Sequence, residues 1–307
     1  MDYKPSGTII CFGSLIMDIS IQCGKLPAIG ETVYTYEDYR INPGGKGGNQ
    51  AVAAARSGGN VTLIGRIAGD EYGQQLIDAF QEDRIHTQAL ITDRHSKTGV
   101  AFVWVDKDGH NSCVCSLGVN AKVTCEDLSV WESLFTEGSI VMTTLEHSDD
   151  ILDKITRMAK EHGCTLIVDP SSKDYSKLTP VIARRIDILK PNEIETEILT
   201  GVTVRNKKDA AKAIGVLKEK GIRMPIISMG EQGAVYEDNG KLVSIDGIKV
   251  RTVDTTAAGD TFIGSMAAKL SQGDSLYSSV IYANKAAAFC VQRRGAQISI
   301  PFEENVL

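Results

Sequence analysis

The spacing of apolar and polar residues predicts strands that alternate with helices along most of the chain. Short apolar runs bounded by turn residues are typical of buried strands, and apolar residues three or four positions apart are typical of helices. The predicted strands are 8–12, 61–67, 139–142, 165–169, a short one near 188, and 226–229. The predicted helices are about 50–57, a segment around 72–80, 150–162, 193–199, 207–220, 259–270 and 276–293. This alternation indicates an α/β fold with a mainly parallel, Rossmann-like sheet and helices on both faces, so we expect one domain over residues 1–307.

Two other segments, 18–40 and 98–118, do not fit this rhythm. They alternate polar and apolar residues with a period of two, as half-exposed strands do. The strands predicted in them are 18–22, 31–39, 99–105 and 112–117, the last two joined by a turn at Asp108-Gly109. We therefore expect a small β-sheet that stands off the main domain as a lid, formed by about residues 15–41 and 97–119.

Composition and charge narrow the classes of function. The 307 residues carry a formal net charge of -6, which disfavours a nucleic-acid or anionic-membrane partner, since either usually meets a basic patch. No apolar stretch approaches the roughly 20 residues of a membrane-spanning helix, and the N-terminal apolar run is too short for a secretory signal. The seven cysteines include no C-x-x-C pair, and the five histidines show no metal-ligand spacing. Reduced thiols in a cytoplasmic protein explain this pattern better than disulfides or a zinc site.

The stretch from Val253 to Phe262 carries the strongest chemical signal. Small residues run directly into a predicted helix there, so the backbone N–H groups of residues 257–260 can converge on one point. Unpaired amides and the helix dipole make such a terminus an anion site, suited to phosphate or to the charge that develops in phosphoryl transfer. Asp260, in the first turn, could accept a proton from a hydroxyl held at that point. The alternative is an ordinary helix start, at which the dipole merely favours an aspartate.

A second glycine-rich stretch, Gly44-Gly45-Lys46-Gly47-Gly48-Asn49, precedes the predicted helix near residue 50. Four glycines cost conformational entropy, so the chain must approach something closely there or adopt positive φ. The stretch is not a phosphate-binding P-loop, because Arg40 stands where the first glycine would be and Gly47 where a Ser or Thr would bind magnesium. It is not the dinucleotide-binding motif G-x-G-x-x-G either, because Gln50 stands where the last glycine would be. A loop with one lysine and one asparagine suits a hydroxyl-rich or anionic small molecule, and a simple tight turn is the alternative.

Together these stretches resemble the paired signatures of the ribokinase-like (PfkB) carbohydrate kinases, and the resemblance, closest to the ribokinase branch, covers nearly the whole chain. The matching segments are Gly44-Gly45-x-Gly47-x-Asn49, Lys190-Pro191-Asn192-Glu193-Ile194-Glu195, Ser228-Met229-Gly230-Glu231-Gln232-Gly233, Asp254-Thr255-x-Ala257-Ala258-Gly259-Asp260 and Gly295-Ala296-Gln297-Ile298-Ser299. The resemblance implies an enzyme that moves the γ-phosphoryl group of ATP to the primary hydroxyl of a pentose such as ribose, with Mg²⁺ and K⁺ as cofactors. It also implies a homodimer joined through the lid, since a lone small sheet exposes edges that need a partner.

The resemblance also assigns roles to particular residues. Asp260 would be the catalytic base, and the amides of Ala257, Ala258, Gly259 and Asp260 would form the anion hole. The residues that would bind the sugar are Asp18, Gly45, Lys46, Asn49, Glu146 and Asp260. Those that would line the nucleotide site are Asn192, Ser228, Gly230, Glu231, Gly233, Gly259 and Asn284. Glu195 would hold Mg²⁺ through water, and the ligands of K⁺, mostly backbone carbonyls, would come from Asp254, Thr256, Cys290, Arg293, Gly295 and Ser299.

One position departs from the family pattern. Ribokinases read Gly-Ser-x-Asn-x-Asp after the first strand, where this chain has Gly13-Ser14-Leu15-Ile16-Met17-Asp18. An apolar side chain cannot hydrogen-bond a hydroxyl, so Ile16 opens the choice of acceptor to 2-deoxyribose, another sugar or a nucleoside. A non-catalytic sugar-binding regulator is a further alternative, against which Asp260 argues. A nucleotide-binding oxidoreductase is a third, and it would need the dinucleotide motif that this chain lacks.

Overall fold

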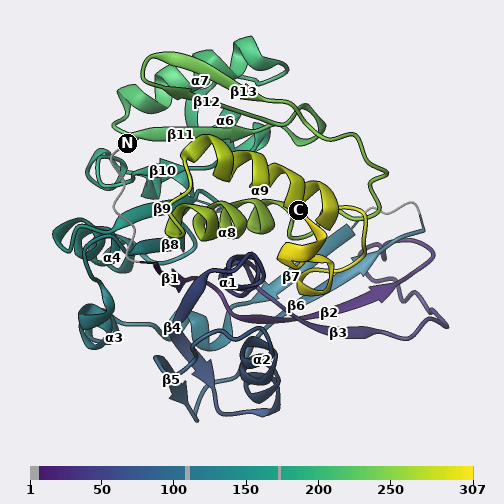
Figure 1. The fold of residues 1–307 in the computed structure, drawn as a ribbon. Helices are drawn as coiled ribbons and strands as arrows, with labels where there is room; N and C mark the ends of the chain where they lie inside the picture. Colours follow the sequence, from purple (N-terminus) through teal and green to yellow (C-terminus); the bar gives the residue numbers. More distant parts are fainter. Residues whose placement is uncertain (1–6, 108–110, 172–173, 307) are drawn as a thin grey trace.

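The computed structural model describes residues 7–107, 111–171 and 174–306, and its centre is a sheet of nine described strands (Figure 1). They lie in the order β13-β12-β11-β10-β9-β8-β1-β4-β5. Their bounds are β1 Thr8–Phe12, β4 Asn60–Ala68, β5 Leu90–Asp93, β8 Ile140–Thr144, β9 Thr165–Asp169, β10 Ile188–Leu189, β11 Met224–Ser228, β12 Ala234–Asp238 and β13 Lys241–Ile245. Neighbours are parallel from β5 to β11, and β12 and β13 add an antiparallel hairpin at one edge. The predicted mainly parallel α/β sheet is therefore confirmed.

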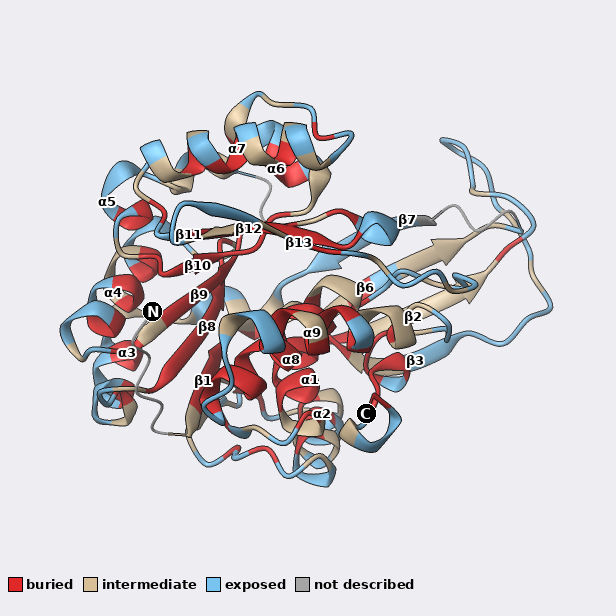
Figure 2. Ribbon diagram, turned by 45° about the horizontal axis from the view of Figure 1, so that its top comes forward, coloured by how far each residue is buried: buried red, intermediate tan, exposed pale blue. Residues whose placement is uncertain are grey.

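Helices cover both faces of this sheet (Figure 2). Their bounds are α1 Lys46–Arg56, α2 Glu71–Glu82, α3 Cys125–Trp131, α4 Asp149–Glu161, α5 Pro180–Ala183, α6 Glu193–Thr200, α7 Lys207–Glu219, α8 Ala258–Ser271 and α9 Leu276–Cys290. None of them, in the described part of the chain, is long and apolar enough to span a lipid bilayer. The layer of α1, α2, α8 and α9 shares a core with Ile9 and Cys11, and the layer of α3, α4 and α5 shares another with Ile10 and Phe12. Successive residues of β1 thus enter opposite cores, which is why this strand reads as an unbroken apolar run.

A second, smaller sheet stands beside the main domain, with its described strands in the order β3-β2-β6-β7 (Figure 2). Its strands are β2 Ile16–Gln22, β3 Arg40–Gly44, β6 Gly99–Val105 and β7 Asn111–Ser116. Two distant parts of the chain meet in it through the parallel pair β2 and β6, so the predicted small sheet, here called the lid, is confirmed. The predicted turn at Asp108-Gly109 lies outside the described residues.

The predicted strand at 31–39 is wrong. β3 begins only at Arg40, where it pairs antiparallel with β2. Residues 31–39 belong to neither of the described sheets, and the side chains of Tyr34 and Tyr36 are exposed. Alternating side chains are insufficient for a strand when no neighbouring strand pairs with the backbone N–H and C=O groups.

Candidate active site

Polar side chains gather at the carboxyl ends of β1, β8 and β9, close to the starts of α1 and α8. At their centre is the carboxylate of Asp260, on the first turn of α8. Its Oδ2 accepts a hydrogen bond from Asn49 Nδ2 at 3.0 Å, and its Oδ1 accepts one from Gln50 Nε2 at 3.1 Å. Gln50 Nε2 also donates to Oδ2 of Asp169, the last residue of β9, at 3.3 Å. The crevice outside the carboxyl ends of parallel strands is the usual ligand site of such sheets.

The glycine-rich stretch is not a loop ahead of a helix near residue 50. α1 begins earlier than predicted, at Lys46, inside that stretch. Gly45 has a φ of 79°, and a Cβ atom there would lie 2.5 Å from the carbonyl oxygen of Ser14. A Cβ atom on Gly47 would lie 2.5 Å from the carbonyl carbon of Gly13. Glycine is required because α1 starts directly against the end of β1, and this close approach carries the amide side chains of α1 to the central carboxylate.

One side of this carboxylate is lined by residues predicted to bind a sugar. The Oδ1 atom of Asn49 is buried and has no hydrogen-bond partner among the described residues. Glu146, just beyond β8, accepts a hydrogen bond from Ser14 Oγ through its Oε2 at 3.0 Å. Asp18 reaches in from lid strand β2, and a Cβ atom on Gly44 would lie 2.2 Å from its Oδ2. The structure therefore brings lid, sheet and helix side chains together around an unpaired acceptor, which suits a hydroxyl donor.

The charges of the site shift one another's pKa. Burial raises the pKa of Asp18 to about 6, with an added contribution from Asp260 and opposition from Lys46. Burial also raises the pKa of Asp260, where Lys46 opposes the shift and Asp169 adds to it. The pKa of Glu146 is raised by burial as well. Burial alone would lower the pKa of Lys46, but the surrounding carboxylates outweigh it and raise the pKa, so Lys46 keeps its positive charge.

The backbone turn before α8 presents free amides. Ala257 has a φ of 61°, a left-handed conformation that turns the chain into the helix. The N–H groups of Ala257, Gly259 and Asp260 meet no acceptor among the described residues. The N–H of Ala258 differs, because it donates to the carbonyl oxygen of Thr255 at 3.2 Å. The free amides and the helix dipole are thus available to an anion at the start of α8.

The residues predicted to line a nucleotide site fall in two groups, and the first lies at the start of α6. Asn192 Oδ1 accepts the N–H of Glu195 at 2.8 Å, and Glu195 Oε2 accepts the N–H of Asn192 at 2.9 Å. The other carboxylate oxygen of Glu195 accepts from Ser171 Oγ at 3.0 Å. Ser228 lies beside this group, because its N–H donates to the carbonyl oxygen of Pro191 at 3.0 Å.

The second group surrounds the segment that follows β13. A Cβ atom on Gly233 would lie 2.0 Å from the carbonyl oxygen of Ile245, so glycine is needed there. Asn284, on α9, donates through Nδ2 to the carbonyl oxygen of Asp246 at 2.9 Å. The turn between β11 and β12 contains Gly230, Glu231 and Gly233. The two groups therefore meet at β11, since Ser228 ends that strand and the turn follows it.

The residues predicted to hold a monovalent cation come from the segment before α8 and the segment after α9. Asp254 Oδ2 accepts the N–H of Gly295 at 2.9 Å. The Sγ atom of Cys290 lies 3.0 Å from Ser299 Oγ and 3.6 Å from the carbonyl oxygen of Thr256. These contacts bring the two segments together directly behind the amide turn.

Arg293 takes a different position from the other predicted cation residues. The predicted helix 276–293 ends early, because α9 stops at Cys290 and the chain then turns. The guanidinium of Arg293 lies over the ring of Phe289, 4.5 Å from its centroid, and the residue is exposed. Its side chain therefore stands apart from the contacts that join the two segments.

Three residues of the site are given no role by the sequence reasoning: Gln50, Asp169 and Lys190. The sequence shows Gln50 only as the residue that breaks a dinucleotide motif, although it follows Asn49 directly. Asp169 ends a predicted buried strand, and a charge at the carboxyl end of a parallel strand is a signal that could have found it. Lys190 precedes the N-x-x-E element, and the structure buries it beside Gly259.

An α/β sheet with a β-lid, a buried aspartate at a helix start and free amides beside it define a carbohydrate kinase. A family profile described as pfkB family carbohydrate kinase matches residues 6–303, so the chain belongs to that family, and the predicted family is confirmed. The chain is 35% identical over 300 residues to the ribokinase of Haemophilus influenzae, covering 98% of this chain and 97% of that protein. It is 29% identical over 297 residues to the deoxyribokinase of Salmonella typhi, covering 97% of this chain and 96% of that protein. Among solved structures, Arabidopsis thaliana ribokinase complexed with ribose and ATP matches with a TM-score of 0.85 at 28% identity, covering 97% of this chain and 96% of that chain.

Proposed function

We propose that this protein transfers the γ-phosphoryl group of ATP to the primary hydroxyl of a pentose, with ribose as the first candidate acceptor. The observation that carries the proposal is the carboxylate of Asp260, held by two side-chain amides beside the free N–H groups of Ala257, Gly259 and Asp260. The choice of donor and acceptor is supported by the similar Arabidopsis thaliana ribokinase, whose structure is a complex with ribose and ATP.

In the proposed reaction, Asp260 accepts the proton of the sugar hydroxyl as that oxygen bonds to the γ-phosphorus. The bond from this phosphorus to the bridging oxygen of ADP breaks in line with it, and the free amides stabilise the charge on the transferring group. Asn49 and Gln50 donate to the two carboxylate oxygens, so they orient the base. The lid would cover the sugar and exclude water, which otherwise would accept the phosphoryl group in its place.

The sugar would lie between the lid and the main sheet. Asp18 approaches that space from the lid and Glu146 from the end of β8. The start of α1 supplies the remaining contacts, through Gly45, Lys46 and Asn49. The unpaired Oδ1 of Asn49 is the acceptor that fits a hydroxyl donor best, because no described residue satisfies it.

The nucleotide would lie on the other side of Asp260, with Mg²⁺ beside its phosphates. The residues proposed to line it are Asn192, Ser228, Gly230, Glu231, Gly233, Gly259 and Asn284. Bound Mg²⁺ would neutralise phosphate charge, and Glu195 fits the role of holding it through water. Burial raises the pKa of Glu195, and Asp169 adds to the shift while Lys190 opposes it, so a bound cation would further favour the charged form of this carboxylate.

K⁺ is proposed to bind where the segments before α8 and after α9 meet. Asp254 and Gly295 are hydrogen-bonded there, and Cys290 contacts Ser299 and Thr256, so the two segments lie close together. A bound cation would supply positive charge behind the amide turn. The chain's own part is to fix the turn, through the hydrogen bond that Asp254 Oδ1 accepts from the Thr256 N–H at 2.9 Å.

2-Deoxyribose is the second candidate acceptor. Ile16 is buried at the start of β2, on the strand that carries Asp18, and offers no hydrogen bond. The similarity to the Salmonella typhi deoxyribokinase is compatible with this choice. A hexose, a nucleoside or a non-catalytic role in sugar sensing would each give a distinct result in an assay of several acceptors.

We also propose that the enzyme works as a homodimer in the cytoplasm. Ile41, Phe102 and Val114 are exposed apolar residues of the lid, which a second copy would cover. The seven cysteines form no disulfide, as suits the reducing compartment in which ATP is abundant.

The test of this function is ATP consumption with ribose, 2-deoxyribose, hexoses and nucleosides as acceptors, followed by Asp260→Asn. This substitution keeps the shape of the side chain and removes the base, so kcat should fall ~10²–10⁴-fold while the affinities for sugar and ATP stay unchanged. Asp274→Asn, at an exposed position, is the matched control and should keep full activity. Retention of more than about a tenth of kcat by Asp260→Asn would refute the base. Absence of phosphorylated product with every acceptor would favour the sugar-sensing alternative.

A further inference from the structure

A lysine that is largely buried lies at the end of β10. Lys190 follows that strand directly, its N–H donates to the carbonyl oxygen of Val168 at 3.2 Å, and only 3% of the residue is exposed. Its Nζ makes no hydrogen bond and no ion pair with any residue that the structure describes. The carboxylate of Glu195 is near enough for the two charges to act on each other, but a largely buried ammonium group that no hydrogen bond satisfies is unfavourable, so this position is suited to a ligand of opposite charge.

The ammonium group is directed at the start of α8. A Cβ atom on Gly259 would lie 3.0 Å from Lys190 Nζ, so this nitrogen is next to the backbone whose N–H groups are free. The ammonium group, these amides and the positive end of the helix dipole therefore converge on one place. Each of the three favours an anion, and a phosphate group can accept hydrogen bonds from the ammonium group and from the amides.

The other lysine of the site is Lys46, which is half-buried at the start of α1. Lys46 acts on the pKa of Asp18 and of Glu146, which are the carboxylates proposed to bind the sugar. Lys190 acts on the pKa of Glu195, on the nucleotide side. Lys46 also acts on Glu195, but Lys190 Nζ is the lysine nitrogen that lies next to Gly259, so Lys190 is the one that faces the proposed phosphates.

We propose that Lys190 is a catalytic residue that binds the β- and γ-phosphate oxygens of ATP and holds the γ-phosphoryl group against the free amides of α8. This inference rests on the proposed kinase function. As the bond to the sugar oxygen forms and the bond to ADP breaks, negative charge grows on the bridging oxygen of ADP, and the ammonium group stabilises it. The sugar proton goes to Asp260, so Lys190 stays protonated throughout.

The test is to measure the binding of ADP and of adenosine to the whole protein by titration calorimetry with Mg²⁺ present. Only ADP carries phosphates, so the comparison distinguishes a contact with the phosphates from contacts with the rest of the nucleotide. Lys190→Met removes the charge and keeps most of the length of the side chain. We expect its affinity for ADP to fall about tenfold or more, because it loses a charge-assisted contact, while its affinity for adenosine stays within about twofold. Its kcat/KM for ATP should fall ~10²–10³-fold, the usual loss when one donor to a developing charge is removed. The KM for the sugar should stay within about twofold, since that ligand is not touched.

Two further variants keep the proposal falsifiable. Lys160→Met, at an exposed position of α4, is the matched control and should change none of these quantities. Lys190→Arg keeps the charge with a different shape and should recover part of the affinity for ADP. Equal losses of ADP and adenosine affinity in Lys190→Met, or a clear fall in its melting temperature, would show a structural role and overturn the proposal. A kcat/KM for ATP within about threefold of the wild type would do the same.

The calorimetry also separates this inference from the function on which it rests. ADP and adenosine bind without turnover, so their ratio does not depend on which acceptor the enzyme uses. A wild-type protein that phosphorylates nothing but still loses ADP affinity in Lys190→Met would refute the kinase reaction and support the phosphate contact.

Discussion

Asp18 lies where the lid meets the main domain, and we expect its protonation to link sugar binding to pH. Burial, together with Asp260, raises its pKa to about 6, compared with about 3.9 for a free aspartate. A raised pKa means that the carboxylate takes up a proton as the pH falls below about 6, and it then loses an acceptor for a sugar hydroxyl. We expect kcat/KM for the sugar, which reports groups of the free enzyme, to fall below about pH 6.

The control for this pH dependence is Asp18→Asn, which cannot titrate at that position. Its kcat/KM should be lower throughout, and the fall near pH 6 that belongs to Asp18 should be missing from its profile. A wild-type kcat/KM that stays constant from about pH 8 to about pH 5 would contradict the assignment.

Ile16 lies two positions before Asp18 on β2, so both side chains face the same side of the lid. It is 5% exposed and apolar, where a sugar-binding amide would donate or accept a hydrogen bond. Each hydrogen bond lost from a buried hydroxyl costs roughly 1–3 kcal/mol, so ribose should lose its advantage over a sugar that lacks one hydroxyl. We expect kcat/KM for 2-deoxyribose to be comparable to that for ribose or higher. Ile16→Asn should shift the ratio of the two values toward ribose.

The matched control for the acceptor is Ile16→Val, which stays apolar and should leave the ratio unchanged. Steady-state rates with the two sugars measure it directly. A wild-type preference for ribose above about a hundredfold would mean that another group replaces the missing amide. An unchanged ratio in Ile16→Asn would show that this position does not contact the acceptor.

At the scale of elements, the sequence predicts best what local interactions decide. β1 and β9 have the predicted bounds, because a short apolar run between turn residues can be recognised without knowing which strand it pairs with. α6 starts where Asn192 can cap it. The hairpin of β12 and β13 was not predicted, although Asn239-Gly240 between them is a strong hairpin signal and both residues have positive φ. The strand predicted at 31–39 is wrong because a strand also needs a neighbouring strand to pair with, and the local sequence does not show whether one is present.

The same limit applies to the site. The motifs point to Asp260 and Asn49, and the structure joins them with a hydrogen bond. Gln50, by contrast, bonds to Asp169 and Asp260, which lie 119 and 210 positions further along the chain. No spacing within a motif encodes such a contact, because it depends on how α1 and α8 pack on the sheet.

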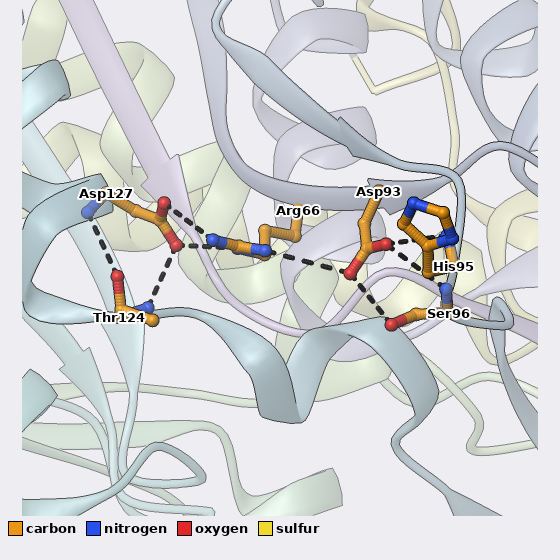
Figure 3. A network of polar contacts seen from close by, with 6 residues as sticks. All are labelled: Arg66, Asp93, His95, Ser96, Thr124 and Asp127. Carbon is orange, nitrogen blue, oxygen red and sulfur yellow. Dashed lines mark hydrogen bonds and ion pairs between the residues drawn. The ribbon is translucent and has the colours of Figure 1, made fainter.

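Arg66 ties both ends of the β6–β7 hairpin to the main sheet (Figure 3). Its guanidinium donates to the two carboxylate oxygens of Asp127, at 2.6 Å and 2.9 Å, and lies 3.7 Å from Asp93. Asp93 accepts hydrogen bonds from Ser96, just before β6. Asp127 accepts the N–H of Thr124 at 2.9 Å, at the start of α3 and after β7. One side chain thus fixes where this half of the lid leaves the main domain and where it returns.

Arg66→Met should loosen the lid more than the main sheet. It leaves partly buried carboxylates without their partner, which we expect to cost about 1–3 kcal/mol of the free energy of unfolding. Hydrogen exchange at the amides of β6 and β7 should be faster, because the hairpin can open without unfolding the rest. Arg157→Met, at an exposed position of α4, is the control for the loss of one arginine. Unchanged exchange in β6 and β7 would contradict this role of Arg66.

At the scale of the whole molecule, the two faces of the lid differ in chemistry. The face that carries Asp18 is turned toward Asp260 and Lys46, whose charges act on its pKa. The opposite face carries a row of apolar side chains, one from each strand and each opposite the next: Ile41, Ile19, Phe102 and Val114. Of these, Ile41, Phe102 and Val114 are 36%, 44% and 60% exposed. An apolar row across a whole sheet is a surface that soluble proteins usually cover with a partner.

We expect this partner to be a second copy of the chain. Two identical apolar faces can cover each other about a two-fold axis. In addition, the edge strands β3 and β7 are open in the described structure. Sedimentation at micromolar concentration should give twice the 33.1 kDa of one chain. Phe102→Asp puts a charge into the row and should give monomers, whose freer lid raises the KM for the sugar. Val130→Asp, which changes an exposed apolar residue on α3 instead, should remain dimeric. A monomeric wild type would refute the dimer. A Phe102→Asp variant that still dimerises would show that the contact between the two copies lies elsewhere on the molecule.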